Sequence, residues 1–284
     1  MSEKQQKNTK QSIIGPFDSL REYMAALESQ GQVMQVNNLD QDAYEATGFM
    51  YRLIDKIGWA DAPAVVFNNI KVNGQWHEGP IIANQYGRWD CDGLAFGIEP
   101  SKDERSVVYQ NVLAKLESLA TKDKQWQEIQ PTEIEAGDAH CKEVVVLGDD
   151  INVLNFPFIQ TNPGDAGPYI NTGSVILEDP ERGRNVGTYR CQVKGPRKIA
   201  INPERNQHGW TFLMDMKARG ETSAKVALVL GADPITFSMS SSKPTRLGQD
   251  ELSVAGGFIG KSLEVVKCET NSLRVPANVE MVIE

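Results

Sequence analysis

Hydrophobic residues recur at helical spacing in the first 120 residues of the chain. Ser19 and Glu22 have the spacing of a capping box, and Gly31 supplies a stop signal, so a helix is predicted between them. The further elements that apolar patterns predict are a strand at 33–36, a helix at 46–57, a strand at 64–67 and a helix at about 106–119. An Asn-Gly pair at 73–74 predicts a tight turn. This part is expected to alternate helix and strand.

The pattern changes after about residue 140, where short β-rich segments are separated by clusters of turn residues. The predicted strands cover 143–147, 169–177, 186–193, 198–201, 225–230, 235–239, 263–267 and 280–283, with one helix at about 210–217. Many short strands separated by turns favour a β-barrel. The polar stretch 121–138 marks the expected seam between an α/β lobe and a β lobe.

Composition places the chain among globular proteins. Its 284 residues are 40% hydrophobic and 24% charged, and this apolar fraction excludes a disordered chain. The formal net charge of -9 argues against nucleic acid or anionic membrane as the main partner. A local basic pocket for one phosphate stays compatible with that charge. The polar N-terminus lacks the apolar core of a signal peptide, and no apolar run approaches the length of a membrane span. We therefore expect a soluble cytoplasmic protein whose four cysteines are reduced and mostly buried in the core.

Four polar residues stand out among the strands of the second half: Asn185, Arg190, His208 and Glu251. Asn, His and Glu form a mixed oxygen and nitrogen ligand set that suits Mn²⁺ or Mg²⁺ better than zinc. In the alternative interpretation, Asn185 caps a turn, His208 caps the following helix and Glu251 is a solvated acid. Arg190 either grips a carboxylate or phosphate, or extends to water from a strand edge.

Other candidate groups are less specific. A serine-rich loop at 238–244 gathers hydroxyls, backbone donors and Lys243, which can cradle a phosphate, although such loops are commonly only solvated. His77 and His140 have no apparent partners and are expected at the surface or satisfied in the core. No Walker loop, GxSxG, HExxH or GxGxxG motif occurs.

Asn185 and Arg190 stand five residues apart, so in a straight strand their side chains would point to opposite faces. Both can reach one site if Asn185 lies in a turn before the strand, or if Gly187 permits a bulge. We predict a break at 186–187. An unbroken ladder over 184–192 would count against a shared site.

The motifs of the second half form a longer series. In chain order they are Asn185-Val-Gly-Thr-Tyr-Arg190, Asn206-Gln-His208, Gly231-Ala-Asp-Pro234, Asp250-Glu251 with Ala255-Gly256 and Gly260, Val266-Lys-Cys-Glu-Thr-Asn271, and Val275-Pro-Ala277. This order and spacing, over about residues 140 to 284, resembles the UbiD family of reversible decarboxylases. The preceding α/β lobe is similar to the N-terminal domain of that family.

The resemblance implies an α+β fold with a disordered tail at 1–15, an N-terminal α/β lobe at 16–130 and a split β-barrel at 131–284 that binds prenylated FMN. It implies non-oxidative, reversible decarboxylation of an aromatic, heteroaromatic or α,β-unsaturated carboxylic acid, with the flavin as electron sink. The implied partners are a flavin prenyltransferase that supplies the cofactor, a divalent metal (Mn²⁺ or Mg²⁺), a nearby K⁺, and further copies of the full-length chain in a homo-oligomer. A metal would neutralise the cofactor phosphate inside an acidic protein.

The resemblance also implies roles for single residues. Asn185, His208 and Glu251 match metal-ligand positions, and Arg190 matches an arginine that pairs with a catalytic carboxylate beside the substrate. The positions that match cofactor contacts are Thr188, Tyr189, Arg190, Gln207, His208, Ser241, Ser242, Lys243 and Glu251.

The sequence departs from the family pattern in one respect. The family draws two catalytic carboxylates from a Glu-Gly-Pro-x-Gly-Glu/Asp segment after the Val-Pro-Ala strand pair, and a C-terminal α/β domain closes the substrate pocket. The printed sequence reaches Glu284 before such a segment. The favoured interpretation is a fragment of a decarboxylase. The alternatives are a subunit completed by another polypeptide, a non-catalytic flavin-binding or phosphate-binding protein, and a simple flavin reductase.

Overall fold

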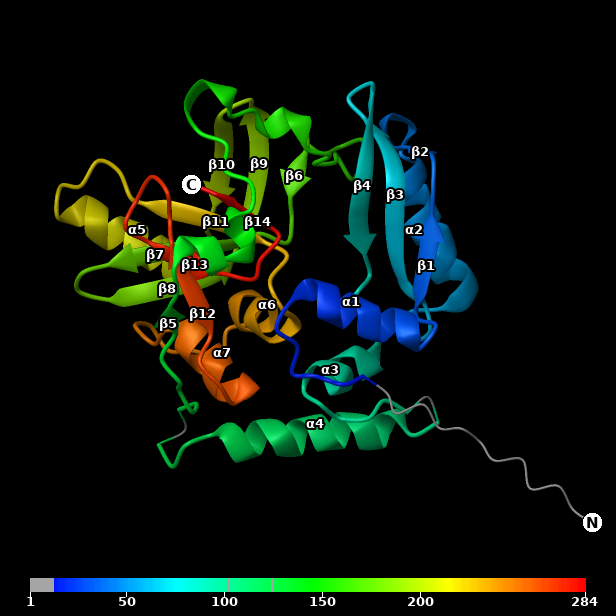
Figure 1. Cartoon of the computed structure of the whole chain (residues 1–284), viewed down its shortest axis with the longest axis horizontal. Helices are drawn as coiled ribbons and strands as arrows, with labels where there is room; N and C mark the ends of the chain where they lie inside the picture. Colours follow the sequence, from blue (N-terminus) through cyan, green and yellow to red (C-terminus); the bar gives the residue numbers. More distant parts are fainter. Residues whose placement is uncertain (1–12, 102, 124) are drawn as a thin grey trace, which may run out of the picture.

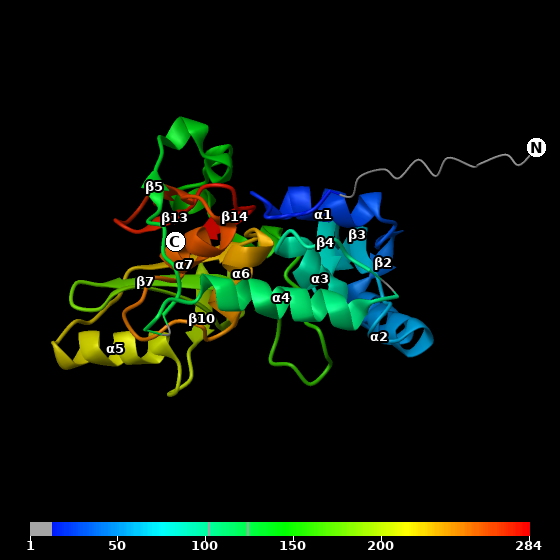
Figure 2. The same ribbon diagram turned by 90° about the horizontal axis from the view of Figure 1, so that it is seen from below.

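The computed structural model describes residues 13–101, 103–123 and 125–284, and residues 1–12 of the predicted tail lie outside these ranges. One sheet with its helices occupies one side of the molecule in Figure 1, and three further sheets with their helices occupy the other. Helix α4 (Arg105–Leu119) runs beneath both parts in Figure 1 and crosses in front of them in Figure 2, and it contacts α3 (Trp89–Ala95) and α7 (Glu251–Ile259). The mixed α/β architecture agrees with the predicted fold class at that level.

The N-terminal sheet is built around one long strand. Its four strands are β1 (Val33–Val36), β2 (Leu39–Asp40), β3 (Ala64–Val72) and β4 (Gln75–Ala83). β1 and β2 run parallel to β3 along one edge, and β4 pairs antiparallel with it on the other. Asn73 and Gly74 take positive φ angles of 53° and 77° in the β3–β4 turn, as the Asn-Gly pair predicts.

Helices α1 (Leu20–Ser29) and α2 (Glu45–Ile57) pack on this sheet where the sequence predicts them. The Ser19 hydroxyl accepts a hydrogen bond from the Glu22 backbone N–H at 3.2 Å, which confirms the predicted cap. Tyr23 and Leu27 of α1 are fully buried beside Ala64 of β3. None of the described helices is long and apolar enough to cross a membrane.

The second half holds ten strands in the described residues, most of them short. They are β5 (Thr132–Glu133), β6 (Tyr169–Ile170), β7 (Ser174–Asp179), β8 (Gly183–Thr188), β9 (Arg190–Gly195), β10 (Lys198–Asn202), β11 (Val226–Leu230), β12 (Glu264–Lys267), β13 (Arg274–Pro276) and β14 (Met281–Ile283). They form three sheets with the strand orders β10-β9-β6, β14-β11-β7-β8 and β13-β12-β5. No sheet among the described residues closes into a ring, so the split β-barrel stays a prediction.

Helices α5 (His208–Ala218) and α6 (Pro234–Ser241) complete the second half, together with α7. The strand predicted at 235–239 is wrong, because this segment is α6. Asp233 caps the helix by accepting hydrogen bonds from the Ile235 and Thr236 backbone N–H groups, and Pro234 occupies the first turn, where its missing N–H costs nothing.

Three other strand predictions need correction. Residues 143–147 form no strand, and Val144 to Leu147 are exposed. The predicted strand at 169–177 is two strands, β6 and β7, which belong to different sheets. The predicted strand at 186–193 is likewise divided into β8 and β9, and the break falls at Tyr189 instead of 186–187. The β7–β8 ladder is continuous from Asp179↔Gly183 to Ser174↔Thr188.

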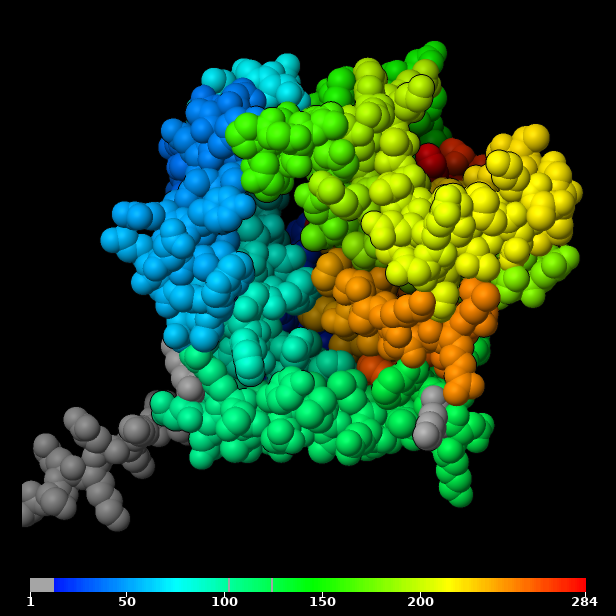
Figure 3. Space-filling model, turned by 180° about the vertical axis from the view of Figure 1, so that it is seen from behind, coloured from blue at the N-terminus to red at the C-terminus, as the bar shows by residue number. Residues whose placement is uncertain are grey.

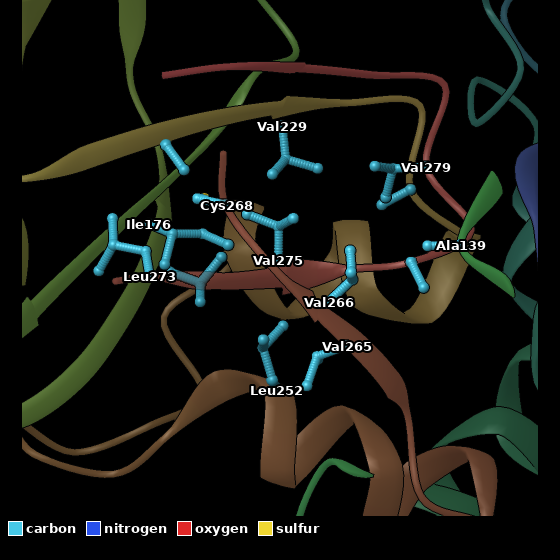
Figure 4. Packing of buried hydrophobic residues seen from close by; sticks show 14 residues of the cluster. Ala139, Ile176, Val229, Leu252, Val265, Val266, Cys268, Leu273, Val275 and Val279 are labelled. Atoms are coloured by element: carbon cyan, nitrogen blue, oxygen red, sulfur yellow. The ribbon is translucent and has the colours of Figure 1, made fainter. Parts of the chain in front are cut away.

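The largest apolar cluster of the second half joins two sheets and α7, as Figure 4 shows. Leu252 of α7 lies against Val265 and Val266 of β12, while Val229 of β11 lies across Val275 of β13. Burial of such side chains stabilises the fold by about 25 cal/mol per Å² of apolar surface. The cluster therefore fixes α7 against the sheets.

Aromatic rings join the N-terminal part to the second half. The Tyr86 ring, which follows β4, stacks on Tyr23 of α1 with centroids 5.5 Å apart and on Phe237 of α6 with centroids 5.1 Å apart. The interplanar angles are 19° and 11°. Figure 3 shows the surface hollowed between the blue and cyan N-terminal part and the second half. The stack therefore joins the two parts through α6.

Candidate metal and flavin site

Glu251 is a deeply buried carboxylate at the first position of α7, with only 4% of its surface exposed. One oxygen accepts a hydrogen bond from the Val186 backbone N–H of β8 at 2.9 Å, and the other accepts from the Thr245 hydroxyl at 2.7 Å. Burial raises the pKa of Glu251 to about 7, although these hydrogen bonds oppose the rise. The prediction that Glu251 is solvated, made in the alternative interpretation, is wrong.

Asn185 lies inside β8 and is 3% exposed, so it does not cap a turn. Its side-chain Nδ2 donates a hydrogen bond to the Tyr189 hydroxyl at 3.1 Å. The Gly209 backbone N–H, at the start of α5, donates to the same hydroxyl at 3.0 Å. These bonds connect the strand that carries Asn185 to the helix that carries His208.

His208 is the first residue of α5, and Gln207 holds the N-cap position, so His208 is not the helix cap. Its Nδ1 lies 4.0 Å from the nearer Glu251 oxygen. Burial lowers the pKa of His208, and the positive charge of Lys243 lowers it further. Both effects favour the neutral imidazole, which is the form that binds metals.

The three predicted metal ligands thus come together from β8, α5 and α7. Within the described residues, no group of three or more His, Cys, Asp and Glu side chains could hold a metal ion. A cation here would need the Asn185 amide oxygen beside Glu251 and His208, with further oxygens from a cofactor phosphate or water. One carboxylate, one amide and one neutral imidazole fit Mn²⁺, which accepts both oxygen and nitrogen ligands.

Hydroxyl groups from three elements meet beside these ligands. The Ser240 hydroxyl of α6 lies 2.7 Å from that of Ser174 in β7 and 3.2 Å from that of Thr188 in β8. The sequence singled out Ser241 and Ser242, whose hydroxyls donate to the Ser238 carbonyl at the exposed end of α6. Ser240 lies within the predicted serine-rich loop 238–244 but is not among the cofactor positions that the family resemblance implies.

Lys243 connects the end of α6 to the segment before α5. Its ammonium group donates a hydrogen bond to the Asn206 carbonyl at 3.0 Å. A cavity of about 470 Å³ opens beside this segment, and its lining residues are Asn202, Pro203, Glu204, Arg205, Asn206 and Trp210. The predicted cofactor positions Gln207, His208 and Lys243 therefore border one region of the surface.

Arg190 begins β9, which belongs to a different sheet from Asn185. Its side chain is 60% exposed, and its guanidinium lies 4.6 Å from the centroid of the Tyr169 ring. One guanidinium nitrogen is 3.9 Å from a carboxylate oxygen of Asp165. Arg190 thus extends to water, as one of its two predicted interpretations expects, while its guanidinium contacts the Tyr169 ring. Asp165 carries no motif that would have identified it from the sequence.

Comparisons with known proteins identify the family of the chain. Residues 132–284 match the family model described as UbiD, 3-octaprenyl-4-hydroxybenzoate carboxy-lyase Rift-related domain. The chain is 29% identical over 274 residues to the phenolic acid decarboxylase of Bacillus subtilis (strain 168), a match that covers 94% of this chain and 54% of that protein. The chain therefore belongs to the UbiD family.

Two solved structures extend the likeness. An evolved dimeric form of the UbiD-class enzyme HmfF from Pelotomaculum thermopropionicum, in complex with prFMN, is 28% identical, with a TM-score of 0.75 over 94% of this chain and 56% of that chain. The closed form of vanillic acid decarboxylase from Sedimentibacter hydroxybenzoicus is 27% identical, with a TM-score of 0.78 over 94% and 54%. The chain spans about half the length of these relatives.

Proposed function

We propose that this chain binds prenylated FMN together with a divalent metal, and that it takes part in the decarboxylation of an aromatic, heteroaromatic or α,β-unsaturated carboxylic acid. The observation that carries the proposal is that Glu251 is bonded to β8 next to Asn185 and lies 4.0 Å from His208, while the Tyr189 hydroxyl links Asn185 to the helix of His208. A buried carboxylate without a cation is costly, and a divalent ion would offset that cost. Membership of the UbiD family supports the same chemistry.

In the proposed site the three ligands would hold Mn²⁺ or Mg²⁺ through the Glu251 carboxylate, the His208 imidazole and the Asn185 amide oxygen. Lys243 and the hydroxyls at the end of α6 would face the cofactor phosphate. When bound, prenylated FMN supplies an electron sink for the electron pair that is left when CO₂ departs. The resident residues orient the substrate against the flavin and hold the phosphate in place.

Arg190 is the residue that we assign to the substrate. A guanidinium presents two parallel N–H donors to a carboxylate, so it can bind the substrate acid in one orientation. Its contact with the Tyr169 ring restricts its rotation, and the weak 3.9 Å approach of Asp165 leaves its donors available. We therefore expect Arg190 to bind the carboxylate that is lost as CO₂.

The test is to co-express the chain with a flavin prenyltransferase, identify the bound flavin by mass spectrometry, and measure CO₂ release from a panel of aromatic and acrylic acids. Glu251→Gln should abolish metal-dependent binding of the flavin and any CO₂ release. Glu178→Gln removes an exposed carboxylate from neighbouring β7 and should behave like the wild type. Equal flavin and metal content in the two variants would contradict the metal assignment.

The same experiment separates turnover from binding alone. Exchange of labelled bicarbonate into the acid would show that the chain completes the reaction. Bound prenylated flavin without CO₂ release or exchange would instead favour a flavin-binding subunit that needs carboxylates from another polypeptide. Absence of flavin in a folded, metal-loaded chain would contradict the proposed cofactor.

A further inference from the structure

The Tyr189 hydroxyl is a junction between β8 and α5. Tyr189 lies at the break between β8 and β9 and is 5% exposed. Its oxygen accepts from Asn185 Nδ2 at 3.1 Å and from the Gly209 backbone N–H at 3.0 Å. A hydroxyl oxygen has two acceptor sites, so the two donors use both of them. One buried atom therefore fixes the strand that carries Asn185 relative to the helix that carries His208.

Two glycines make room for the Tyr189 side chain. A Cβ atom on Gly187 of β8 would lie 2.3 Å from the Tyr189 hydroxyl oxygen, and a Cβ atom on Gly209 of α5 would lie 2.5 Å from it. Neither approach is possible without displacing the ring, since packed interiors yield little to added volume. The phenol is thus enclosed by the same two elements that it joins by hydrogen bonds.

We propose that Tyr189 is a positioning residue for the metal site. Because Nδ2 of Asn185 donates to the Tyr189 hydroxyl, the opposite end of the amide, Oδ1, is the end presented to a cation. Because the same hydroxyl accepts from Gly209 N–H, it fixes the first turn of α5, where His208 stands. The inference rests on the proposed metal site. In this role Tyr189 orients the Asn185 amide. That role is distinct from the flavin contact that the family resemblance implies.

Groups that orient metal ligands typically change metal affinity about 10-fold to 100-fold when removed. Tyr189→Phe keeps the ring and removes the oxygen, so we expect Mn²⁺ to bind about 10-fold to 100-fold more weakly. Free Mn²⁺ is counted by its electron paramagnetic resonance signal in the presence of saturating FMN. Tyr23→Phe is the matched control, because it removes another buried hydroxyl bond, to the Gln85 carbonyl at 2.6 Å, in the N-terminal part. The control should bind Mn²⁺ like the wild type.

A second measurement separates positioning from direct flavin contact. FMN affinity in the presence of a chelator should be the same for the wild type and for Tyr189→Phe. A loss of FMN affinity without metal would show that the hydroxyl contacts the flavin, and would overturn the inference. Unchanged Mn²⁺ affinity in Tyr189→Phe would overturn it as well, while leaving the proposed metal site intact. A wild-type chain that binds no Mn²⁺ would overturn both.

Substitution of Gly209 tests the inference independently, because it alters no side chain that forms a hydrogen bond. Gly209→Ala places a Cβ atom against the Tyr189 hydroxyl and should displace it, so Mn²⁺ affinity should fall as in Tyr189→Phe. Gly48→Ala in α2 is the matched control, because an added Cβ there meets nothing within 4 Å. Wild-type Mn²⁺ affinity in a folded Gly209→Ala chain would count against the inference.

Discussion

Burial changes the acidity of Glu251 and His208 in opposite directions. It raises the pKa of the Glu251 carboxyl to about 7 and lowers the pKa of the His208 imidazole. Near neutral pH both groups can therefore be uncharged when no cation is present, which limits the electrostatic cost of the site. A divalent ion would displace the proton from the carboxyl and bind the neutral imidazole directly.

The cysteines give a prediction for single residues. Burial raises the pKa of Cys191 to about 11 and that of Cys268 to about 12, and it also raises the pKa of buried Cys91. Since the thiolate is the reactive form, these thiols should resist Ellman's reagent in the folded chain. Half-buried Cys141 should react first, and Cys141→Ser should remove the first phase of the reaction with Ellman's reagent. All four should react after denaturation, whereas fast reaction of Cys191 or Cys268 in the folded chain would contradict the packing.

The sequence could single out Asn185, His208 and Glu251 as candidate metal ligands, since they are polar residues among strands and match a family motif. It could not single out Asp165, and it placed Ser240 only in a serine-rich loop. Their partners, Arg190 and Thr188, lie 25 and 52 residues away, and only the pairing of sheets and helices brings them together. The role of Tyr189 was equally hidden, because it depends on space left by two glycines on different elements.

Among the elements, α6 shows how local patterns mislead. Residues 235–239 alternate apolar and hydroxyl side chains, which is typical of a strand, yet Asp233 and Pro234 form a strong helix start. The segment 143–147 misleads differently: it has β-branched residues, yet it pairs with no strand among the described residues. Helix α1 was predictable because apolar spacing agrees with the Ser19 cap, and α2 because its apolar spacing ends at Gly58, whereas α4 was predicted from apolar spacing alone.

The cap of α6 gives a prediction that depends on pH. Burial raises the pKa of Asp233 above 3.8, so the folded chain keeps this proton at pH values where the unfolded chain has lost it. The stability that protonation contributes is present below pH 3.8 and is lost as pH rises through the folded pKa. Asp233→Asn keeps an acceptor for the Ile235 and Thr236 N–H groups but cannot ionise.

We therefore expect the unfolding free energy of the wild type, relative to Asp233→Asn, to fall as pH rises from 3.8 through the folded pKa of Asp233, measured by urea titrations over a pH series. Asp233→Ala should be about 1 kcal/mol less stable than Asp233→Asn at every pH because the cap is gone. If the difference in unfolding free energy between the wild type and Asp233→Asn stayed constant with pH, this result would contradict the burial of an ionisable cap.

The two parts of the molecule are joined by apolar packing, by an aromatic stack and by ion pairs such as Arg21–Glu280 and Lys261–Asp18. Helix α4 packs its Leu119 end with Ile235 of α6 and Val254 of α7, and the Tyr86 ring stacks on Phe237 of α6. These apolar and aromatic contacts pass through α6, the helix that carries Ser240 next to β8. The N-terminal part can therefore influence the site without contributing a predicted ligand.

The stack predicts a measurable coupling between the two parts. Parallel aromatic pairs contribute about 0.5 to 1.5 kcal/mol beyond their buried area, so a double-mutant cycle of Tyr86→Leu and Phe237→Leu should give a coupling energy in that range. The Phe156–Phe158 pair, with centroids 6.2 Å apart and Phe156 exposed, is the matched control and should couple more weakly. If the losses of unfolding free energy in Tyr86→Leu and Phe237→Leu were additive, the two rings would not be coupled energetically and the stack would not stabilise the contact between the parts.

The change of sheet at Tyr189 has a consequence for how this scaffold can diversify. Asn185 stands on the β14-β11-β7-β8 sheet and Arg190 on the β10-β9-β6 sheet. Insertions or substitutions in the β9–β10 hairpin can thus reshape the surroundings of Arg190 while the ladder under Asn185 keeps its register. Directed evolution of acid selectivity is best concentrated on β6, β9 and β10, with β8, α5 and α7 held constant.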